Sequence, residues 1–269
     1  MNIHDNVTEL TPAQIRQKIR QNQLTRPTAG LASGYVQTNV AILPKELSYD
    51  FKLFCEQNPK SCPLIEVLEP GSTEAINSAP NSDIRSDVGL YKIYENGVLS
   101  SETPNISNVW RDDFVTFLIG CSFTFESALI KNGIPLSHFE QGKNVSMFIT
   151  NIPTKKVGMF SGPMVVSMRS IAELKVDKAI KITSQFPSMH GAPIHIGNPE
   201  EIGISNINNP DFGDITLIQK NEVPVFWACG VTPQSIAMNS NPKIMITHSP
   251  GYMFITDKKD EEYDESNAN

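Results

Sequence analysis

The sequence lacks several features that would assign it to a common class of protein. No Gly-x-Gly-x-x-Gly follows an apolar run and no Gly-Lys-Ser/Thr phosphate loop occurs, so nothing supports a nucleotide cofactor. No apolar run approaches the ~18 residues of a membrane-spanning helix. Only four cysteines occur in 269 residues, which is too few for a disulfide framework. We expect free thiols and no cofactor, and we leave a divalent metal open.

The charge distribution excludes further partners. The net charge is −7, but residues 257–269 hold six acids against two lysines, so the rest of the chain is nearly balanced. Without a Lys/Arg stripe, neither nucleic acid nor an anionic membrane is an expected partner. The polar amino terminus has no apolar signal-peptide core. We therefore expect a cytoplasmic protein with a small-molecule acid as substrate, and a homodimer as the commonest symmetric assembly.

Apolar patterns and turn residues predict both helices and strands. Thr11 before Pro12 is typical of a helix start, and Ile15 and Ile19 would share one face of that helix. Gly, Thr and Pro make residues 26–44 look like an ordered loop. The acidic, apolar-poor residues 257–269 are predicted to be disordered. The remaining predictions are helices at 12–21, 45–57 and 175–186, and strands at 63–68 and 90–94.

Two segments, which we call the first unit (115–150) and the second unit (223–256), share one order of features. Each has an apolar run that ends at a cysteine, then Cys-x-x-Thr-x-x-Ser, a histidine, and Met-Phe-Ile-Thr. The matching positions are Cys121, Thr124, Ser127, His138 and 147–150 in the first unit, and Cys229, Thr232, Ser235, His248 and 253–256 in the second. This pattern indicates an internal duplication of a strand-Cys-helix-strand unit.

The duplication predicts an α/β fold. We expect a mixed sheet in a three-layer core, formed by residues 1–152 and 223–269, and a smaller two-layer α+β subdomain inserted at 153–222. A cysteine between a strand end and a helix start lies near unpaired backbone N–H groups, which favour the thiolate. If a twofold axis relates the units, Cys121 and Cys229 face one crevice. The alternative is that both cysteines only fill the core.

Other polar residues are weaker candidates. His190 and His195 lie among glycines and prolines that allow a ligand close to the backbone, although either histidine could serve structure alone. Arg85, Arg111 and Arg169 could bind a carboxylate, but Arg85 and Arg111 have acidic neighbours that favour local ion pairs. Cys55 and Cys62 make no zinc motif without a second pair.

Several strings together resemble the D-glutamate cyclase family, whose bacterial members are often called hydro-lyases, over nearly the whole chain. They are RPTAGLASGYVQTNVAILP (26–44), FCEQNPKSCPLIEV (54–67), DIRSD (83–87), WRDDFVTFLIGCSFTFESAL (110–129), FSGPMVVSMR (160–169), FPSMHGAPIHIG (186–197) and VPVFWACGVTPQ (223–234). The resemblance implies a lyase of D-amino acid metabolism that cyclises D-glutamate to 5-oxo-D-proline with loss of water. It also implies a three-layer α/β part with a smaller two-layer part, and it supplies no catalytic residue set.

Lactam formation needs a neutral amine, a donor for the developing oxyanion and an acid that expels water. We assign proton transfer to the candidates Cys121, Cys229 and His190, and carboxylate binding to Arg85 or Arg169. Thr124, Thr232 and His195 complete the expected substrate-binding set, and no metal ligand is assigned. Three alternatives stay open: a cofactor-independent two-cysteine racemase or epimerase, a non-catalytic binding protein for a small acid, and a dehydratase of a related acid.

Overall fold

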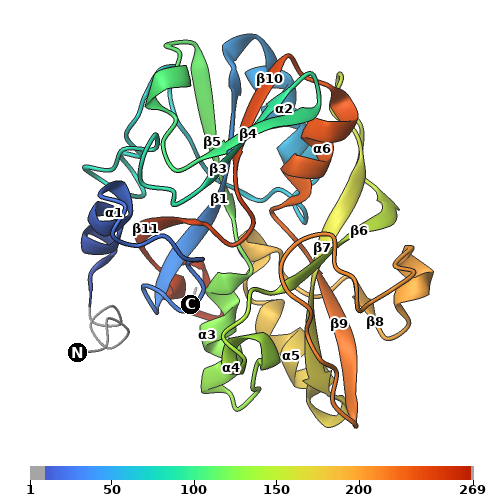
Figure 1. The fold of residues 1–269 in the computed structure, drawn as a ribbon. Helices are drawn as coiled ribbons and strands as arrows, with labels where there is room; N and C mark the ends of the chain where they lie inside the picture. The colour runs from blue at the N-terminus through green and yellow to red at the C-terminus, as the bar shows by residue number, and fades with distance from the viewer. Residues whose placement is uncertain (1–9, 268–269) are drawn as a thin grey trace.

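The computed structural model describes residues 10–267, in which helices and strands are interspersed along the chain (Figure 1). This confirms the expected α/β class. The regular helices are α1 (Pro12–Arg20), α2 (Lys45–Gln57), α3 (Phe123–Lys131), α4 (Ser137–Glu140), α5 (Val176–Thr183) and α6 (Thr232–Ser240). The 3-10 helices are η2 (Ser107–Val109), η3 (Glu173–Lys175), η4 (Pro187–Met189), η5 (Pro199–Ile202), η6 (Asp260–Tyr263) and η7 (Glu265–Asn267).

The strands form two sheets. The larger sheet has the order β2-β5-β1-β10-β3-β4, with β11 also paired to β1, and the smaller sheet has the order β6-β7-β9-β8. The larger sheet contains β1 (Tyr35–Pro44), β2 (Leu64–Val67), β3 (Tyr91–Glu95), β4 (Val98–Thr103), β5 (Phe114–Gly120), β10 (Ile244–His248) and β11 (Phe254–Lys259). The smaller sheet contains β6 (Ser146–Pro153), β7 (Pro163–Ala172), β8 (His195–Ile196) and β9 (Glu222–Ala228).

Strand direction differs from the expected mixed sheet, because every ladder recorded among residues 10–267 is antiparallel. The strands of the smaller sheet are consecutive and lie between residues 146 and 228. This range is wider at both ends than the predicted insertion at 153–222, because β6 and β9 pair with β7 and not with the larger sheet. The domain boundaries themselves stay a prediction.

Each unit connects one sheet to the other. The first unit begins on β5 of the larger sheet and ends on β6 of the smaller one, whereas the second begins on β9 of the smaller sheet and returns to β10 and β11. The chain thus passes between the sheets through Cys121 on the way out and through Cys229 on the way back. In the second unit the extra strand β10 precedes the Met-Phe-Ile-Thr segment.

Apolar side chains cover both faces of the larger sheet. On one face, Phe51 and Phe54 of α2 and Ile236 of α6 pack against Phe117 of β5. On the other face, the irregular segment that follows β2 contributes a second cluster with the strands. The smaller sheet buries Trp227 against α3 and α5, which contact each other and lie in the half of the molecule that contains β7 and β9 (Figure 1).

The three helices predicted outside the units are confirmed. Thr11 accepts a hydrogen bond from the backbone N–H of Gln14, and the Gln14 side chain accepts one from the N–H of Thr11, so a capping box begins α1. Ile15 and Ile19 are buried as expected. Helix α2 spans the predicted residues, and α5 lies within the predicted 175–186.

Two predictions from composition are wrong. Residues 35–44, expected within a loop, form β1, which pairs with β5 on one side and with β10 and β11 on the other. Its polar residues Gln37, Thr38 and Asn39 are buried, and the side chain of each donates to a backbone carbonyl oxygen. Residues 257–267, expected to be disordered, end β11 and form η6 and η7, with Asp260 buried. The last two residues of the predicted tail lie outside the described residues.

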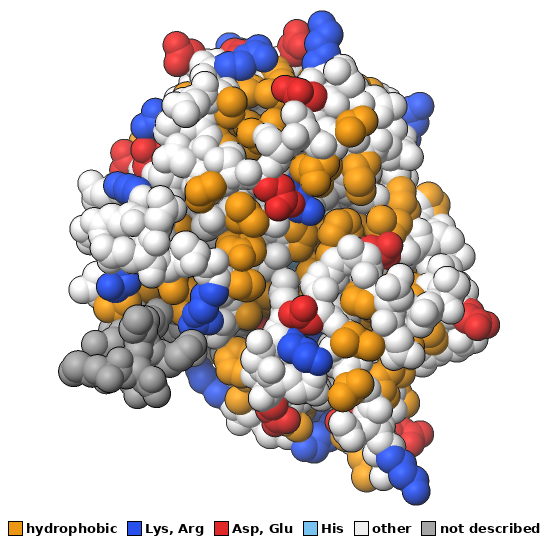
Figure 2. Space-filling view, in the orientation of Figure 1, with side chains coloured by type: hydrophobic (Ala, Val, Ile, Leu, Met, Phe, Trp, Pro, Cys, Tyr) orange, Lys and Arg blue, Asp and Glu red, His pale blue; other side chains and the backbone are white. Residues whose placement is uncertain are grey.

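The visible face of the molecule carries charged side chains of both signs (Figure 2). In Figure 2, Lys and Arg side chains are interspersed with Asp and Glu on this face, and hydrophobic side chains are exposed between them. Among residues 10–267, no helix is both long enough and apolar enough to cross a membrane.

Candidate active site

Each cysteine lies in a short turn between a strand and a helix, which we call the Cys121 turn (residues 121–122) and the Cys229 turn (residues 229–231). These two cysteine turns meet at Asn39, in the middle of β1. The side-chain Nδ2 of Asn39 donates to the carbonyl oxygen of Gly120 at 2.7 Å, one residue before Cys121. Gly230, one residue after Cys229, packs against the same amide: a Cβ at this glycine would lie 1.9 Å from Asn39 Nδ2. A single buried amide therefore contacts both turns, and any larger residue at position 230 would displace it.

Burial decides the protonation state of the two thiols. Burial raises the pKa of Cys121 well above its usual range, although the N–H of Phe123, 3.5 Å from its sulfur, acts in the opposite direction. Burial also raises the pKa of Cys229 to about 11. The expected stabilisation of thiolates by helix N-termini is thus outweighed, and both groups are neutral thiols at neutral pH.

A buried ion cluster lies directly beside the Cys121 turn. Arg169 of β7, which is 1% exposed, donates from Nε and Nη2 to Glu126 Oε1 at 3.0 and 2.5 Å. It also donates to Ser122 Oγ at 2.9 Å and to Ser167 Oγ at 2.7 Å. His138 Nε2 lies 3.1 Å from the same carboxylate oxygen. Four of the five N–H groups of Arg169 are therefore occupied by described residues.

Glu126 remains ionised in this cluster. Burial acts to raise the pKa of Glu126, but its neighbours His138 and Arg169 outweigh this effect and lower the pKa. Sequence analysis did not select Glu126. Its position between the predicted Thr124 and Ser127, in the helix after Cys121, was the available signal, but its partner Arg169 lies 43 residues away.

Helix α3 also lines a small cavity, which we call the α3–η6 cavity. Its volume is about 80 Å³, and since one water needs about 10–15 Å³ it can hold a small polar molecule but not a nucleotide. Neither Cys121 nor Cys229 lines it. Its walls come from the segment 30–37, α3, α4 and η6: Gly30, Leu31, Ala32, Ser33, Gly34, Tyr35, Gln37, Phe123, Glu126, Ser127, Ile130, Phe139 and Asp260.

Two buried oxygen atoms of this wall have no hydrogen-bond partner among residues 10–267. Gln37 donates from Nε2 to the carbonyl oxygens of Thr28 and Leu31, which leaves its Oε1 without a partner. Asp260 accepts from Ser127 Oγ at 3.1 Å on Oδ2, which leaves its Oδ1 without a partner. Burial raises the pKa of Asp260 to about 6. Sequence analysis missed both residues, because one was assigned to a loop and the other to a disordered tail.

His190 follows η4, whose residues Ser188 and Met189 lie against Gly120 at the end of β5. Its Nδ1 is 2.7 Å from the carbonyl oxygen of Lys60 and must carry the proton, because a carbonyl only accepts. Its Nε2 is buried and has no partner among the described residues. Burial lowers the pKa of His190 to about 4, so the ring is neutral. The preceding Ser188 packs its carbonyl against Gly120, which places this loop beside the Cys121 turn.

The two predicted threonines occupy matching positions but differ in bonding. Thr232 donates from Oγ1 to the carbonyl oxygen of Cys229 at 2.6 Å and accepts from the N–H of Val165 at 3.1 Å. Thr124 Oγ1 is buried and has no partner among the described residues. Neither hydroxyl caps its helix.

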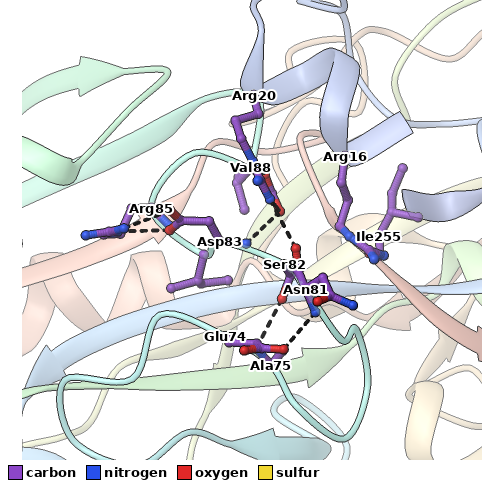
Figure 3. A network of polar contacts seen from close by, with 12 residues as sticks. Arg16, Arg20, Glu74, Ala75, Asn81, Ser82, Asp83, Arg85, Val88 and Ile255 are labelled. Atoms are coloured by element: carbon purple, nitrogen blue, oxygen red, sulfur yellow. Dashed lines mark hydrogen bonds and ion pairs between the residues drawn. The ribbon is translucent and has the colours of Figure 1, made fainter. Parts of the chain in front are cut away.

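Two predicted residues lie apart from this cluster. Figure 3 shows Arg85 paired with Asp83 and pointing away from Arg20 of α1. The Arg85–Asp83 pair, at 2.8 Å, and the Arg111–Asp113 pair, at 2.7 Å, are the local ion pairs that the acidic neighbours favoured. His195 lies on the edge strand β8, with Nε2 2.7 Å from the carbonyl oxygen of Asn198.

The structure thus brings together six of the predicted residues and leaves Arg85 and His195 outside. The six are Cys121, Cys229, His190, Arg169, Thr124 and Thr232. Across residues 10–267, no three His, Cys, Asp or Glu side chains are grouped so that they could hold a metal ion. A metal requirement stays open.

A buried ion cluster next to a small cavity with unpartnered oxygens is typical of a site for a small polar molecule. Comparison with known proteins identifies its family. The model of the D-glutamate cyclase family matches residues 115–257. A "Putative hydro-lyase" of Thermoanaerobacter sp. (strain X514) is 58% identical over 95% of this chain and 97% of its own.

Other relatives agree. A "Putative hydro-lyase" of Bacillus pumilus (strain SAFR-032) is 56% identical over 93% of this chain and 95% of its own. One of Stutzerimonas stutzeri (strain A1501) is 54% identical over 94% and 96%. The chain belongs to the D-glutamate cyclase family, and it is a lyase that breaks a carbon–oxygen bond.

Proposed function

We propose that this enzyme converts D-glutamate to 5-oxo-D-proline and water, with the reacting groups between the Cys121 turn and the α3–η6 cavity. The observation that carries the proposal is the buried Glu126 carboxylate, which Arg169 and His138 hold in the wall of a cavity of about 80 Å³. An enzyme that only bound a hydrophobic ligand would not need a buried, ionised cluster, because such a cluster costs free energy to desolvate. Membership of the family supports the same substrate.

The reaction balances without any co-reactant. The nitrogen of D-glutamate begins as an ammonium group and ends as a lactam N–H, so it loses two protons. The bond from nitrogen to the side-chain carboxyl carbon forms, and one bond from that carbon to oxygen breaks. The departing oxygen takes the two protons and leaves as water. The enzyme has to move protons from nitrogen to oxygen and to stabilise the tetrahedral intermediate.

The residues near the Cys121 turn can deliver protons to the departing oxygen. Because Cys121 and Cys229 are neutral thiols, we assign them as proton donors toward the departing oxygen, in place of nucleophilic thiolates. The unpartnered hydroxyl of Thr124 can hydrogen-bond a substrate oxygen. Arg169 has one N–H left for a substrate carboxylate. His190, with a free Nε2 lone pair, can accept a proton.

Proton NMR tests the proposal directly. Purified protein is incubated with D-glutamate, and in parallel with L-glutamate, in deuterated buffer with and without manganese or magnesium. We expect 5-oxoproline from the D form alone, and the metal arms report the metal requirement. Solvent deuterium at Cα without ring formation would replace the proposal with a racemase. No change in either substrate would remove D-glutamate as the substrate.

A further inference from the structure

The α3–η6 cavity has an unusual lining for an enzyme that binds acids. Its charged side chains are Glu126 and Asp260, and the amide nitrogen of Gln37 is used by the backbone while its carbonyl oxygen has no partner among residues 10–267. Gln37 is 4% exposed and Asp260 is 7% exposed. A buried oxygen without a donor costs free energy, so these acceptors point to a ligand that is rich in N–H groups.

We infer that the α3–η6 cavity is the subsite for the ammonium group of the substrate, and that Asp260 accepts the first proton from it. An ammonium group has three donors and no acceptor. Gln37, Asp260 and Glu126 all line this one cavity, and among residues 10–267 the buried Oε1 of Gln37 and Oδ1 of Asp260 have no donor. The assignment of the proton step rests on the proposed function, whereas the ammonium subsite does not.

The cavity is built to hold its shape without a ligand. The side chain of Gln37 is fixed by its two hydrogen bonds to the 28–31 backbone, at 3.1 and 2.9 Å. The N–H of Asp260 donates to the carbonyl oxygen of Gly34 at 3.1 Å, and Ser127 holds its other carboxylate oxygen. Three elements far apart in sequence are thereby linked, and such pre-organisation lowers the cost of binding.

A metal ion fits this cavity less well than an ammonium group. The described residues include no group of three acidic, Cys or His side chains close enough to share an ion. Part of the wall is apolar, with Phe123, Ile130 and Phe139 beside the oxygens. Apolar side chains suit the carbon atoms next to an amine and do not suit the water shell of a hydrated metal.

The neighbouring cavity has cationic side chains, which suits the other end of an amino acid. It has a volume of about 460 Å³, shares Gly30 and Phe139 with the α3–η6 cavity, and is lined by Arg26 and Lys143. Its acid, Asp214, accepts from the N–H of Asn144 at 2.8 Å. An ammonium group on one side of Phe139 and the non-reacting carboxylate on the other match these charges.

Asp260 is suited to take a proton near neutral pH. Burial raises its pKa to about 6, and this effect exceeds the opposing hydrogen bond from Ser127. The charged groups that face it are Glu126 and Lys131 on α3, and Lys259 and Glu261 on its own segment. A base with a pKa just below the working pH is ionised and still accepts a proton readily.

Calorimetry and NMR on the full chain test the subsite with two probes. Methylammonium chloride reports the ammonium site alone, and D-glutamate is compared with glutarate, which lacks the amine. In the Asp260→Asn variant we expect affinity for both amine probes to fall about 10- to 100-fold, as for the loss of a charged hydrogen bond. Glutarate should bind the variant no more weakly than the wild type. Glu265→Gln, which removes an exposed acid from η7, is the matched control and should change nothing.

Each result decides the inference separately from the proposed function. Amine binding that does not depend on Asp260, or no amine binding at all, overturns the subsite even if 5-oxoproline forms. Tight binding of manganese that Asp260→Asn abolishes would identify a metal site instead. Amine binding that depends on Asp260 supports the subsite even if D-glutamate is not cyclised. If cyclisation occurs, the acidic limb of the kcat/KM profile, near pH 6, should be lost in Asp260→Asn, whereas a purely structural role would leave its position unchanged.

Discussion

The helices that follow the two cysteines have the same sequence pattern but different surroundings. Five residues after each cysteine lies a buried polar side chain, Glu126 in α3 and Gln234 in α6. Glu126 is ionised and contacts Arg169 and His138. Gln234 is neutral, donates to the carbonyl oxygen of His248 at 2.7 Å and lies 3.3 Å from the hydroxyl of Tyr94.

The difference extends along both helices. In the first unit the hydroxyl of Thr124 has no partner among residues 10–267 and Ser127 donates to Asp260 at the cavity, whereas in the second unit the hydroxyl of Thr232 both donates and accepts. Helix α6 is therefore satisfied by the protein itself, and α3 keeps polar capacity for a ligand. The same local pattern can serve packing in one place and chemistry in another, and the partners of each side chain determine which.

The largest expected effect comes from removing the charged centre of the first unit. Glu126→Ala leaves Arg169 buried without its carboxylate, and we expect it to lower the free energy of unfolding by about 3–5 kcal/mol. Gln234→Ala, at the matching position, breaks neutral hydrogen bonds and should cost about 1–3 kcal/mol. Urea unfolding of both variants measures the difference. Equal losses would show that the ionic cluster contributes no more to the free energy of unfolding than the neutral hydrogen bonds of Gln234.

The second effect is on the pH dependence of stability. Burial lowers the pKa of His190 and of His248 to about 4, from 6.5. Between these values the unfolded chain binds a proton that the folded chain does not, so the free energy of unfolding falls as the pH decreases. Each histidine contributes on the order of 3 kcal/mol.

Asp260 acts in the opposite direction in an overlapping range. Its folded pKa is raised to about 6, from 3.8, so its contribution to stability is present at low pH and is lost as the pH rises through this range. Urea unfolding between pH 6.5 and pH 4 should show a net loss of stability on acidification. Asp260→Asn should steepen this loss, and His248→Gln should reduce it. A flat profile in the wild type would mean that the histidines are not buried as neutral rings.

The third effect separates the two thiols. The Cys121 turn leads into α3, and the sulfur of Cys121 accepts a hydrogen bond from the N–H of Phe123, the first residue of that helix. The Cys229 turn leads into α6, whose Thr232 and Gln234 side chains are hydrogen-bonded within the protein. We expect Cys121→Ala to lower kcat for D-glutamate about 100-fold, within the range for loss of a proton-transfer group. Cys229→Ala should lower it less than about tenfold. Near-normal rates in both variants would remove the thiols from the mechanism.

The smallest effect concerns Ser127 and Ser235, which occupy matching positions in the two units. Ser127 donates to Asp260, and this hydrogen bond lowers the pKa of the carboxyl. Ser127→Ala should therefore move the acidic limb of kcat/KM to higher pH by a fraction of a unit to about one unit, with little loss of stability. Ser235→Ala, in the second unit, is the control and should leave the limb in place. A shift in both would point to a general change in the fold.

Local sequence was sufficient for much of the fold. The helices α1 and α2 have their start signals and apolar faces within a few residues, and the strand-Cys-helix order of both units could be read from apolar runs that end at cysteines. Strand β1 could not be predicted in this way. Its polar residues are buried only because three other strands surround it, and those strands come from residues 114–259.

The same limit applies to the candidate site. Cys121, Arg169 and His190 were selected from their neighbours in the sequence, and the structure brings them together. Glu126 and Asp260 were missed because their meaning depends on contacts across 43 and 133 residues. A carboxylate in an acidic tail looks like a solvated charge until its burial is known.

The route of the chain between the sheets has a consequence for motion. Within residues 10–267 the chain passes between the sheets twice, along residues 121–145 and 229–243, and each connection begins with a cysteine turn that contacts Asn39. Any rocking of one sheet against the other has to be absorbed as backbone rotation within these connections. Rotation at the cysteine turns would move the two candidate proton donors, so that opening for substrate and positioning these side chains would be a single movement.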